Sequence, residues 1–158
     1  MLTHNKRLGF TLVEILIVVV ILGILAAIVM PQFSNATTDT KKAALSDQLH
    51  NLRIQVQLYT LQHGDQSPNI TGSSWDDLVA ATTYQGNPRG PYLPSIPKNP
   101  LNSFSNVTVL ESDPQWGDPV AGTDVGFVYN PRSGVVWGTN KAGTKVYNEA
   151  DPNDPSNN

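Results

Sequence analysis

The sequence predicts an α+β fold, in which a long N-terminal α-helical stem packs on a small antiparallel β-sheet domain. Apolar residues run almost without interruption from Phe10 to Met30, and an amphipathic pattern follows as far as residue 63. Beyond Gly64, most of the chain's 12 glycines and 12 prolines separate short extended runs. With 158 residues, the chain has room for one modest domain behind such a helix.

Charge and cysteine content exclude several classes of function. The formal net charge is −3, which argues against nucleic acid as the main partner because phosphate binding needs clustered Lys and Arg. The chain has no cysteine, so disulfides and thiol chemistry are excluded.

The apolar run is long enough to cross a membrane. As a helix from Phe10 to Met30 it spans about 32 Å, close to the thickness of a bilayer core. Lys6 and Arg7 precede it without any acid, so the short N-terminal end is expected in the cytoplasm and the rest on the far side. A cleaved secretory signal peptide is the competing interpretation, but the segment around Ala26 lacks a clean small-x-small cleavage site.

Glu14 is a carboxylate inside this apolar run, and a plain membrane anchor does not explain it. A charge in lipid costs up to about 3 kcal/mol, so such residues usually have a partner. Phe10 lies one helical turn earlier, and a cut between Gly9 and Phe10 would give Phe10 a positive amine at the level of the carboxylate. The alternative is that Glu14 reaches the lipid headgroups by itself.

The amphipathic part of the stem carries one apolar seam at spacings of three and four residues, which predicts a helix half-buried against the rest of the chain. The seam consists of Leu45, Leu49, Leu52, Val56 and Tyr59, with His63 after it. Gly64 is the expected end of this helix. The alternative is a membrane anchor joined to a coiled-coil spacer.

The remaining residues, 64–158, read as a small α+β domain with loops. Ser74 and Asp77 stand in capping-box spacing before a short helix, and Gly90–Pro100 is too rich in proline for regular structure. The extended runs are Phe104–Leu110, Gly126–Tyr129, Val135–Trp137 and a short edge strand at Lys145–Tyr147. The tail from Glu149 is expected to be mobile.

The segment K-R-L-G-F-T-L-V-E-I-L, Lys6–Leu16, resembles the type III leader of type IV pilins and type II secretion pseudopilins. The resemblance implies that a prepilin peptidase cuts after Gly9 and methylates the new amine of Phe10. It also implies that Glu14 guides assembly by facing the amine of a neighbouring subunit, and that the stem helix loosens at Gly23 and Pro31, where helix propensity is also low.

This resemblance implies four parts: a leader peptide at 1–9, a transmembrane and filament-core helix at 10–30, its amphipathic continuation at 31–63, and the domain at 64–158. The implied function is that of a structural subunit of a type II secretion pseudopilus, which drives protein export across the outer membrane. Its partners would be copies of itself, other pilin-like subunits, the peptidase and an inner-membrane assembly platform. The implied location is the bacterial inner membrane, with the C-terminal domain in the periplasm, and then a filament.

Two alternatives stay open at this point. One is a type IV pilus subunit for adhesion, motility or DNA uptake. The other is a membrane-anchored binding domain that never assembles. The missing cysteines favour a pseudopilin, since pilins more often close a C-terminal loop with a disulfide.

The loop Gly90–Pro100 is similar to the corresponding region of the major, G-type pseudopilin, which carries a calcium site in its C-terminal loop. Asn99, Leu101 and Asn102 depart from that pattern, standing where the family usually has Asp, Trp and Gly. Five loop acids could offer oxygens but lack EF-hand spacing; they are Asp113, Asp118, Asp124, Asp151 and Asp154. The sequence therefore favours solvated acids over a metal site and predicts no cofactor, while calcium binding in the C-terminal loops stays an open alternative.

Nothing in the sequence indicates an enzyme. Phosphate-binding, dinucleotide-binding and G-x-S-x-G motifs are all missing. His50 and His63 lie thirteen residues apart without the i, i+4 partner that a helical metal site requires. Both are expected to be structural or surface residues.

Overall fold

The computed structural model describes the backbone of residues 9–157, and their side chains except at 30–35. The predicted leader lies outside the described residues apart from Gly9. The chain forms two compact units, Met1–Asp39 and Thr40–Asn158. The long helix α1, Leu12–Gln62, contributes its first part to one unit and its last part to the other.

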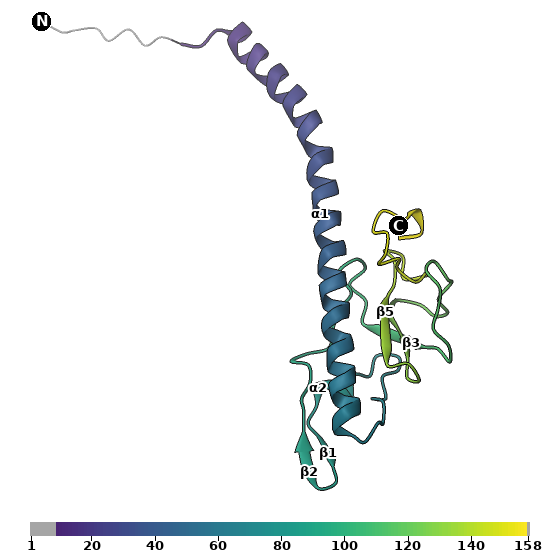
Figure 1. Ribbon diagram of the computed structural model, residues 1–158. Coiled ribbons are helices and arrows are strands. Elements are labelled where there is room, and N and C mark those ends of the chain that lie inside the picture. The colour runs from purple at the N-terminus through teal and green to yellow at the C-terminus, as the bar shows by residue number, and fades with distance from the viewer. Residues whose placement is uncertain (1–8, 158) are drawn as a thin grey trace, which may run out of the picture. The chain divides into compact units, whose positions relative to one another are not determined.

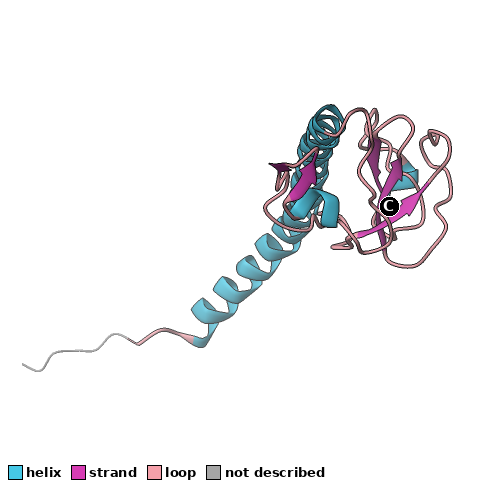
Figure 2. Ribbon diagram, turned by 90° about the horizontal axis from the view of Figure 1, so that it is seen from below, coloured by secondary structure: helices cyan, strands magenta, loops and turns pink. Residues whose placement is uncertain are grey.

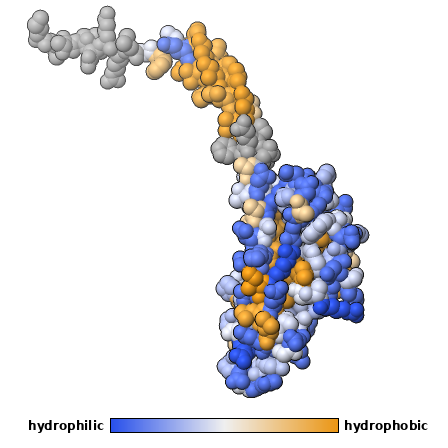
Figure 3. Space-filling model, viewed as in Figure 1, coloured by the Kyte–Doolittle hydropathy of each residue, from blue (hydrophilic) through white to orange (hydrophobic). Residues whose placement is uncertain are grey.

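In the first unit, α1 is apolar on every side. The large side chains from Leu12 to Val29 are all at least 44% exposed, and Figure 3 shows them as a continuous hydrophobic surface. The helix passes through Gly23 and Pro31 without a break (Figure 1). The predicted loosening at these two positions stays a prediction.

The end of α1 is a Schellman motif built around Gly64. The backbone N–H of Asp65 donates to the carbonyl of Thr60 at 3.0 Å, which closes the last turn. Gly64 has a φ of 64°, and a Cβ atom there would collide with the hydroxyl of Tyr84. Glycine is therefore required both by the backbone conformation and by the close contact.

In the second unit, the last part of α1 supplies one wall of the core. The seam side chains Leu45, Leu49, Leu52 and Val56 are at most 1% exposed, and Tyr59 is 8% exposed. The chief side chains packed with them are Trp75, Leu78, Phe127, Tyr129 and Val136. Helix and sheet approach closely at Gly138, where a Cβ would lie 2.9 Å from Leu45 Cδ2.

The other elements of this unit are short. They are α2 (Asp76–Val79), β1 (Thr82–Tyr84), β2 (Asn87–Arg89), β3 (Asn106–Val109), β4 (Val125–Asn130), β5 (Val135–Gly138) and the 3₁₀ turn η1 (Pro155–Asn157). Strands β1 and β2 form a hairpin, while β3, β4 and β5 form a sheet in that order. Figure 2 shows the hairpin and the sheet on different sides of α1. The predicted α+β architecture is confirmed.

The three-stranded sheet is mixed, which corrects the prediction of a purely antiparallel one. Strands β4 and β5 pair antiparallel across the N-P-R-S-G turn, as predicted. Strands β3 and β4 pair parallel, with Val107 opposite Phe127 and Val109 opposite Tyr129. The alternation of apolar residues predicts a strand but not its direction, so orientation was beyond the sequence pattern.

Two local predictions were wrong, and one hairpin was missed. The helix α2 begins after Trp75 without a side-chain cap, and Ser74 Oγ donates instead to Asp76 Oδ2 at 2.9 Å. The segment Lys145–Tyr147 makes only isolated bridges. The hairpin β1–β2 was not predicted, because Pro88 inside β2 reads as a strand breaker.

The tail is held against the domain, contrary to the expectation of mobility. Asn157 is 2% exposed, and its side chain bonds the backbone of Asn148 and Asp151. Hydrogen bonds to asparagine side chains therefore fix a segment whose composition resembles a loose terminus.

Candidate functional site at the start of α1

The first turn of α1 places Thr11 and Glu14 in a capping box. The backbone N–H of Thr11 donates to Glu14 Oε2 at 2.8 Å, and the Thr11 hydroxyl donates to the same oxygen at 2.9 Å. In return, the N–H of Glu14 donates to Thr11 Oγ1 at 3.2 Å. Since α1 begins at Leu12, Thr11 is the N-cap and Glu14 the third residue of the helix.

The role of Thr11 was missed at the sequence level, although the signal was present. T-L-V-E in front of an apolar run is the sequence pattern of a capping box. The structure thus gives Glu14 a partner within its own chain. This arrangement lowers the cost of placing a carboxylate near lipid, because two donors already replace part of its hydration.

The capping box leaves one carboxylate oxygen available. Both donors from Thr11 use Oε2, and in the part of the chain that the structure describes Oε1 has no hydrogen-bond partner. A second donor, such as the amine of another chain, can therefore bind Oε1 without displacing Thr11. Glu14 keeps its negative charge, which the helix N-terminus favours, whether or not a second donor is bound to Oε1.

The predicted cleavage site lies immediately before this box. Gly9 and Phe10 are in a non-helical segment, and both are exposed, Phe10 to 82%. An exposed, irregular peptide bond can be drawn into the active site of a peptidase, whereas a bond within a helix first has to unfold. The geometry is compatible with cleavage after Gly9, which itself stays a prediction.

The apolar surface behind Glu14 requires a partner or a lipid environment. Among the described residues, Leu12–Val29 is the one stretch that is long and apolar enough to span a bilayer. None of its large side chains is buried in the chain itself. The segment can therefore lie in a membrane, or pack among the same segments of other subunits.

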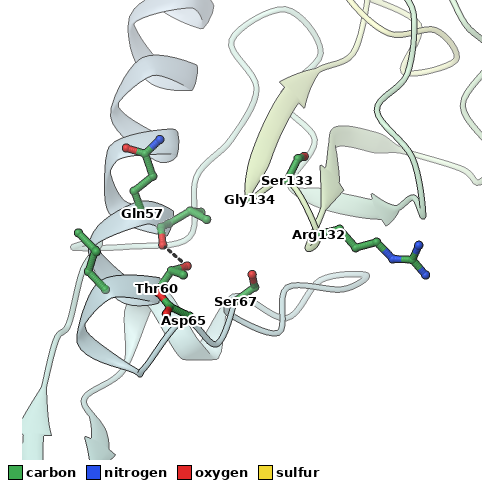
Figure 4. Close-up of a pocket in the computed structure, with 9 residues that line it drawn as sticks. Gln57, Thr60, Asp65, Ser67, Arg132, Ser133 and Gly134 are labelled. Carbon is green, nitrogen blue, oxygen red and sulfur yellow. Dashed lines mark hydrogen bonds between the residues drawn. The ribbon is translucent and has the colours of Figure 1, made fainter.

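The second unit offers a groove of about 380 Å³ beside the last turn of α1 (Figure 4). Its hydroxyl groups already have partners. Thr60 donates to the Val56 carbonyl at 2.9 Å, and Ser67 donates to the Pro131 carbonyl at 2.6 Å. Ser133 donates to Asp113 at 2.6 Å. The described residues lining the groove include no histidine or cysteine, so they contain neither a Ser–His nor a Cys–His pair.

His63 is buried in an aromatic cluster. Its ring stacks on Tyr59 with centroids 3.8 Å apart, and its nitrogens lie 2.9 Å from the Tyr59 carbonyl and 3.0 Å from Thr82 Oγ1. The imidazole therefore bonds the helix end to β1, which is a structural role. His50 lies exposed on α1.

Comparisons with known proteins agree with these features. Residues 4–30 match the family model described as the prokaryotic N-terminal methylation motif. The chain is 34% identical over 116 residues to type II secretion system core protein G of Pseudomonas aeruginosa, covering 73% of this chain and 72% of that protein. It is 30% identical over 140 residues to the protein of the same name in Vibrio cholerae, covering 77% and 92%.

A shorter match connects the chain to another relative. Prepilin peptidase-dependent protein D of Escherichia coli is 41% identical over 83 residues, which cover 51% of this chain and 55% of that protein. A comparison with solved structures found no match. The matches to the G proteins cover about three quarters of the chain, and the chain belongs to the family of type II secretion system core protein G.

Proposed function

We propose that this chain is a structural subunit of a type II secretion pseudopilus. In this proposal a prepilin peptidase cuts after Gly9 and methylates the amine of Phe10, and the shortened chain assembles with further copies into a helical filament. The filament drives protein export across the outer membrane. The chain acts as a building block and not as an enzyme.

The observation that carries the proposal is the state of Glu14. Its carboxylate is held by Thr11 through Oε2, while Oε1 is open to a donor from outside the described chain. A methylated amine at Phe10 of a neighbouring subunit is a cation of the right charge, at the right depth in the membrane. The pairing would neutralise two charges that are costly in lipid when they are apart.

Before assembly, the subunit would lie in the inner membrane as a single-pass protein. The apolar part of α1 spans the bilayer, and Lys6 and Arg7 keep the leader on the cytoplasmic side, where the peptidase would cut. The second unit then lies in the periplasm. An assembly platform in the inner membrane would extract the subunit into the filament.

A type IV pilus subunit is the second candidate. The similarity to prepilin peptidase-dependent protein D supports it, because the name of that relative ties it to the prepilin peptidase. That match covers 51% of the chain, whereas the G-protein matches cover 73% and 77%. The wider coverage by the G proteins thus favours the pseudopilus.

The test is to replace Glu14 and follow cleavage and assembly separately. In Glu14→Leu, cleavage should be retained because the cut site precedes residue 14, while filament formation and secretion should fall at least about tenfold, a loss of 1.4 kcal/mol or more. Filament formation and secretion by Glu14→Gln should lie between those of the wild type and Glu14→Leu, since the amide keeps a hydrogen-bond acceptor without the charge. Ile15→Leu, which keeps the apolar surface, is the control.

Full assembly of Glu14→Leu would refute the proposed pairing, whereas a wild-type subunit that is cut but forms no filament would favour an anchored domain that never assembles. Assembly into long surface fibres in a strain without the secretion machinery would instead favour the pilus. Cleavage is read by intact mass, assembly by electron microscopy, and export by the amount of secreted protein.

A further inference from the structure

The C-terminal loops of the second unit are closed by asparagine side chains. We call this set the amide clasp; it consists of Asn99, Asn102, Asn140, Asn148 and Asn157. The amides of Asn99, Asn102, Asn140 and Asn157 bind backbone groups outside their own turns, while the Asn148 amide binds the Asp154 carboxylate and the N–H groups of the next turn. The segments joined are the Gly90–Pro100 loop, the ends of β4 and β5, and the tail.

Asn99 and Asn102 attach the loop before β3 to the sheet. Asn99 is fully buried, and its Nδ2 donates to the carbonyls of Gly126 at 2.8 Å and Thr139 at 2.9 Å. The Nδ2 of Asn102 donates to Thr139 Oγ1 and to the Asn140 carbonyl, both at 2.9 Å. These are two of the positions at which the sequence departs from the G-type pattern.

The chemistry at position 99 requires an amide. While Nδ2 donates to two carbonyls, Oδ1 accepts the backbone N–H of Leu101 at 2.8 Å. An aspartate in the same place would put a buried negative charge against two carbonyl oxygens and take one donor from each, although the Gly126 carbonyl would still accept the N–H of Thr139 at 3.1 Å. The asparagine therefore performs a role that a carboxylate can take only with a cation beside it.

Asn140, Asn148 and Asn157 close the tail. The backbone N–H of Asn148 donates to Asn157 Oδ1 at 2.7 Å, and Asn157 Nδ2 donates to the carbonyls of Asn148 at 3.2 Å and Asp151 at 3.0 Å. Asn140 Nδ2 donates to the Ser156 carbonyl at 3.2 Å. Asn140 and Asn157 are each 2% exposed, so solvent does not compete for these bonds.

The residues present do not fit the calcium ion that the G-type resemblance implies. Calcium takes six to eight oxygen ligands, usually with several carboxylates. Among residues 9–157, no three His, Cys, Asp or Glu side chains come together in a group that could hold a metal. Asp154 is already engaged, since it accepts Asn148 Nδ2 at 2.7 Å and the Ser156 N–H at 2.8 Å.

We propose that the amide clasp closes the C-terminal loops by itself, so that this subunit folds without calcium or any other divalent cation. The N–H groups of the clasp donate to backbone carbonyl oxygens, and these are atoms of the kind that a bound calcium ion would coordinate. This proposal concerns folding alone, and it stands whether or not the subunit assembles into a pseudopilus.

The first experiment measures the Tm of the full chain in detergent, by near-ultraviolet circular dichroism, in excess EDTA and in millimolar calcium chloride. We expect equal Tm values, and no heat of binding when calcium chloride is titrated in. A Tm raised by calcium, or lowered by EDTA, would overturn the proposal.

The second experiment converts clasp amides to carboxylates. Asn99→Asp and Asn157→Asp should lower the Tm by several degrees in both buffers, whereas the exposed Asn153→Asp in the same tail should leave it unchanged. If Asn99→Asp does not fold, Asn157→Asp and the wild-type comparison still decide the matter. Equal Tm values for Asn157→Asp and wild type would show that the clasp does not hold the tail, and would contradict the proposal.

Discussion

Arg53 of α1 binds the carboxylate of Glu149 in the C-terminal segment through two parallel hydrogen bonds. Nη2 lies 2.6 Å from Oε1 and Nη1 lies 3.0 Å from Oε2, while Nε donates to the carbonyl of Val136 at 2.9 Å. One side chain thus joins the stem helix, strand β5 and the tail. The pair is largely shielded from solvent, with side chains 28% and 14% exposed.

A second ion pair of the same length provides a matched comparison. Arg132 Nη2 lies 2.6 Å from Glu111 Oε2, but these side chains are 74% and 80% exposed. We expect Arg53→Ala to lower the free energy of unfolding by about 3 kcal/mol, because Glu149 and the Val136 carbonyl lose their donors. Arg132→Ala should cost less than about 1 kcal/mol.

Chemical denaturation of the full chain in detergent measures both changes. Arg53→Lys should recover only part of the loss, since an ammonium group cannot reproduce the planar, bidentate contact. Equal effects of Arg53→Ala and Arg132→Ala would contradict the structural role given to Arg53.

The seam of α1 provides a prediction about the core. Leu49→Asp should unfold the second unit, because a carboxylate placed at a fully buried position costs at least about 4 kcal/mol. Gln57→Asp, at an exposed position on the same helix, is the control and should change the Tm little. An unshifted melt for Leu49→Asp would mean that the helix is a spacer and not part of the core.

Two buried tyrosines predict a loss of stability at high pH. Burial, together with the nearby Asp77 carboxylate, raises the pKa of Tyr59 to about 12, and burial raises the pKa of Tyr129 to about 12 as well. The unfolded chain releases these protons near pH 10, so their contribution to stability is complete below about pH 10. It is lost as the pH rises towards 12.

Denaturation curves across this alkaline range measure the effect, with phenolate absorbance reporting the titration. The double variant Tyr59→Phe, Tyr129→Phe should show a shallower decline of stability with pH than the wild type. The same slope in both proteins would show that other groups control alkaline unfolding.

Cleavage after Gly9 and methylation of Phe10 predict a defined mass for the mature subunit. Removal of the nine-residue leader from the chain of 158 residues leaves 149, beginning at Phe10 and carrying one added methyl group. Gly9 replaced by a bulky residue should leave uncut precursor in the membrane, while Asn5→Gln in the leader should be processed normally. Intact mass spectrometry distinguishes these products, and a mature chain beginning at Ala27 or Ile28 would indicate an ordinary signal peptide.

Local sequence patterns predicted the stem helix, but they could not predict contacts between residues far apart in the sequence. The spacing of Leu45, Leu49 and Leu52 follows from helix geometry alone, so the buried face of α1 was readable. The contact between Arg53 and Glu149 joins residues 96 positions apart, and no local pattern records such a pair. The same holds for Asn99 and Thr139 in the amide clasp.

The predictions of strand orientation and of the α2 cap were wrong for different physical reasons. The parallel pairing of β3 with β4 depends on the path of the chain between them, which alternation does not encode. At Ser74, the favoured capping spacing lost to tertiary packing, because Trp75 at the N-cap is fully buried against Phe127. Thr11 and Glu14 show the reverse case, in which a readable local motif was overlooked.

The parallel pairing of β3 and β4 sets a lower limit on the length of the connection between them. A parallel pair needs a crossover of about a dozen residues or more, because the chain must return to the end at which the first strand began. The segment from Leu110 to Asp124 makes this return without a helix. Insertions there only lengthen the path of the chain, whereas deletions would leave too short a connection for β4 to reach its register beside β3.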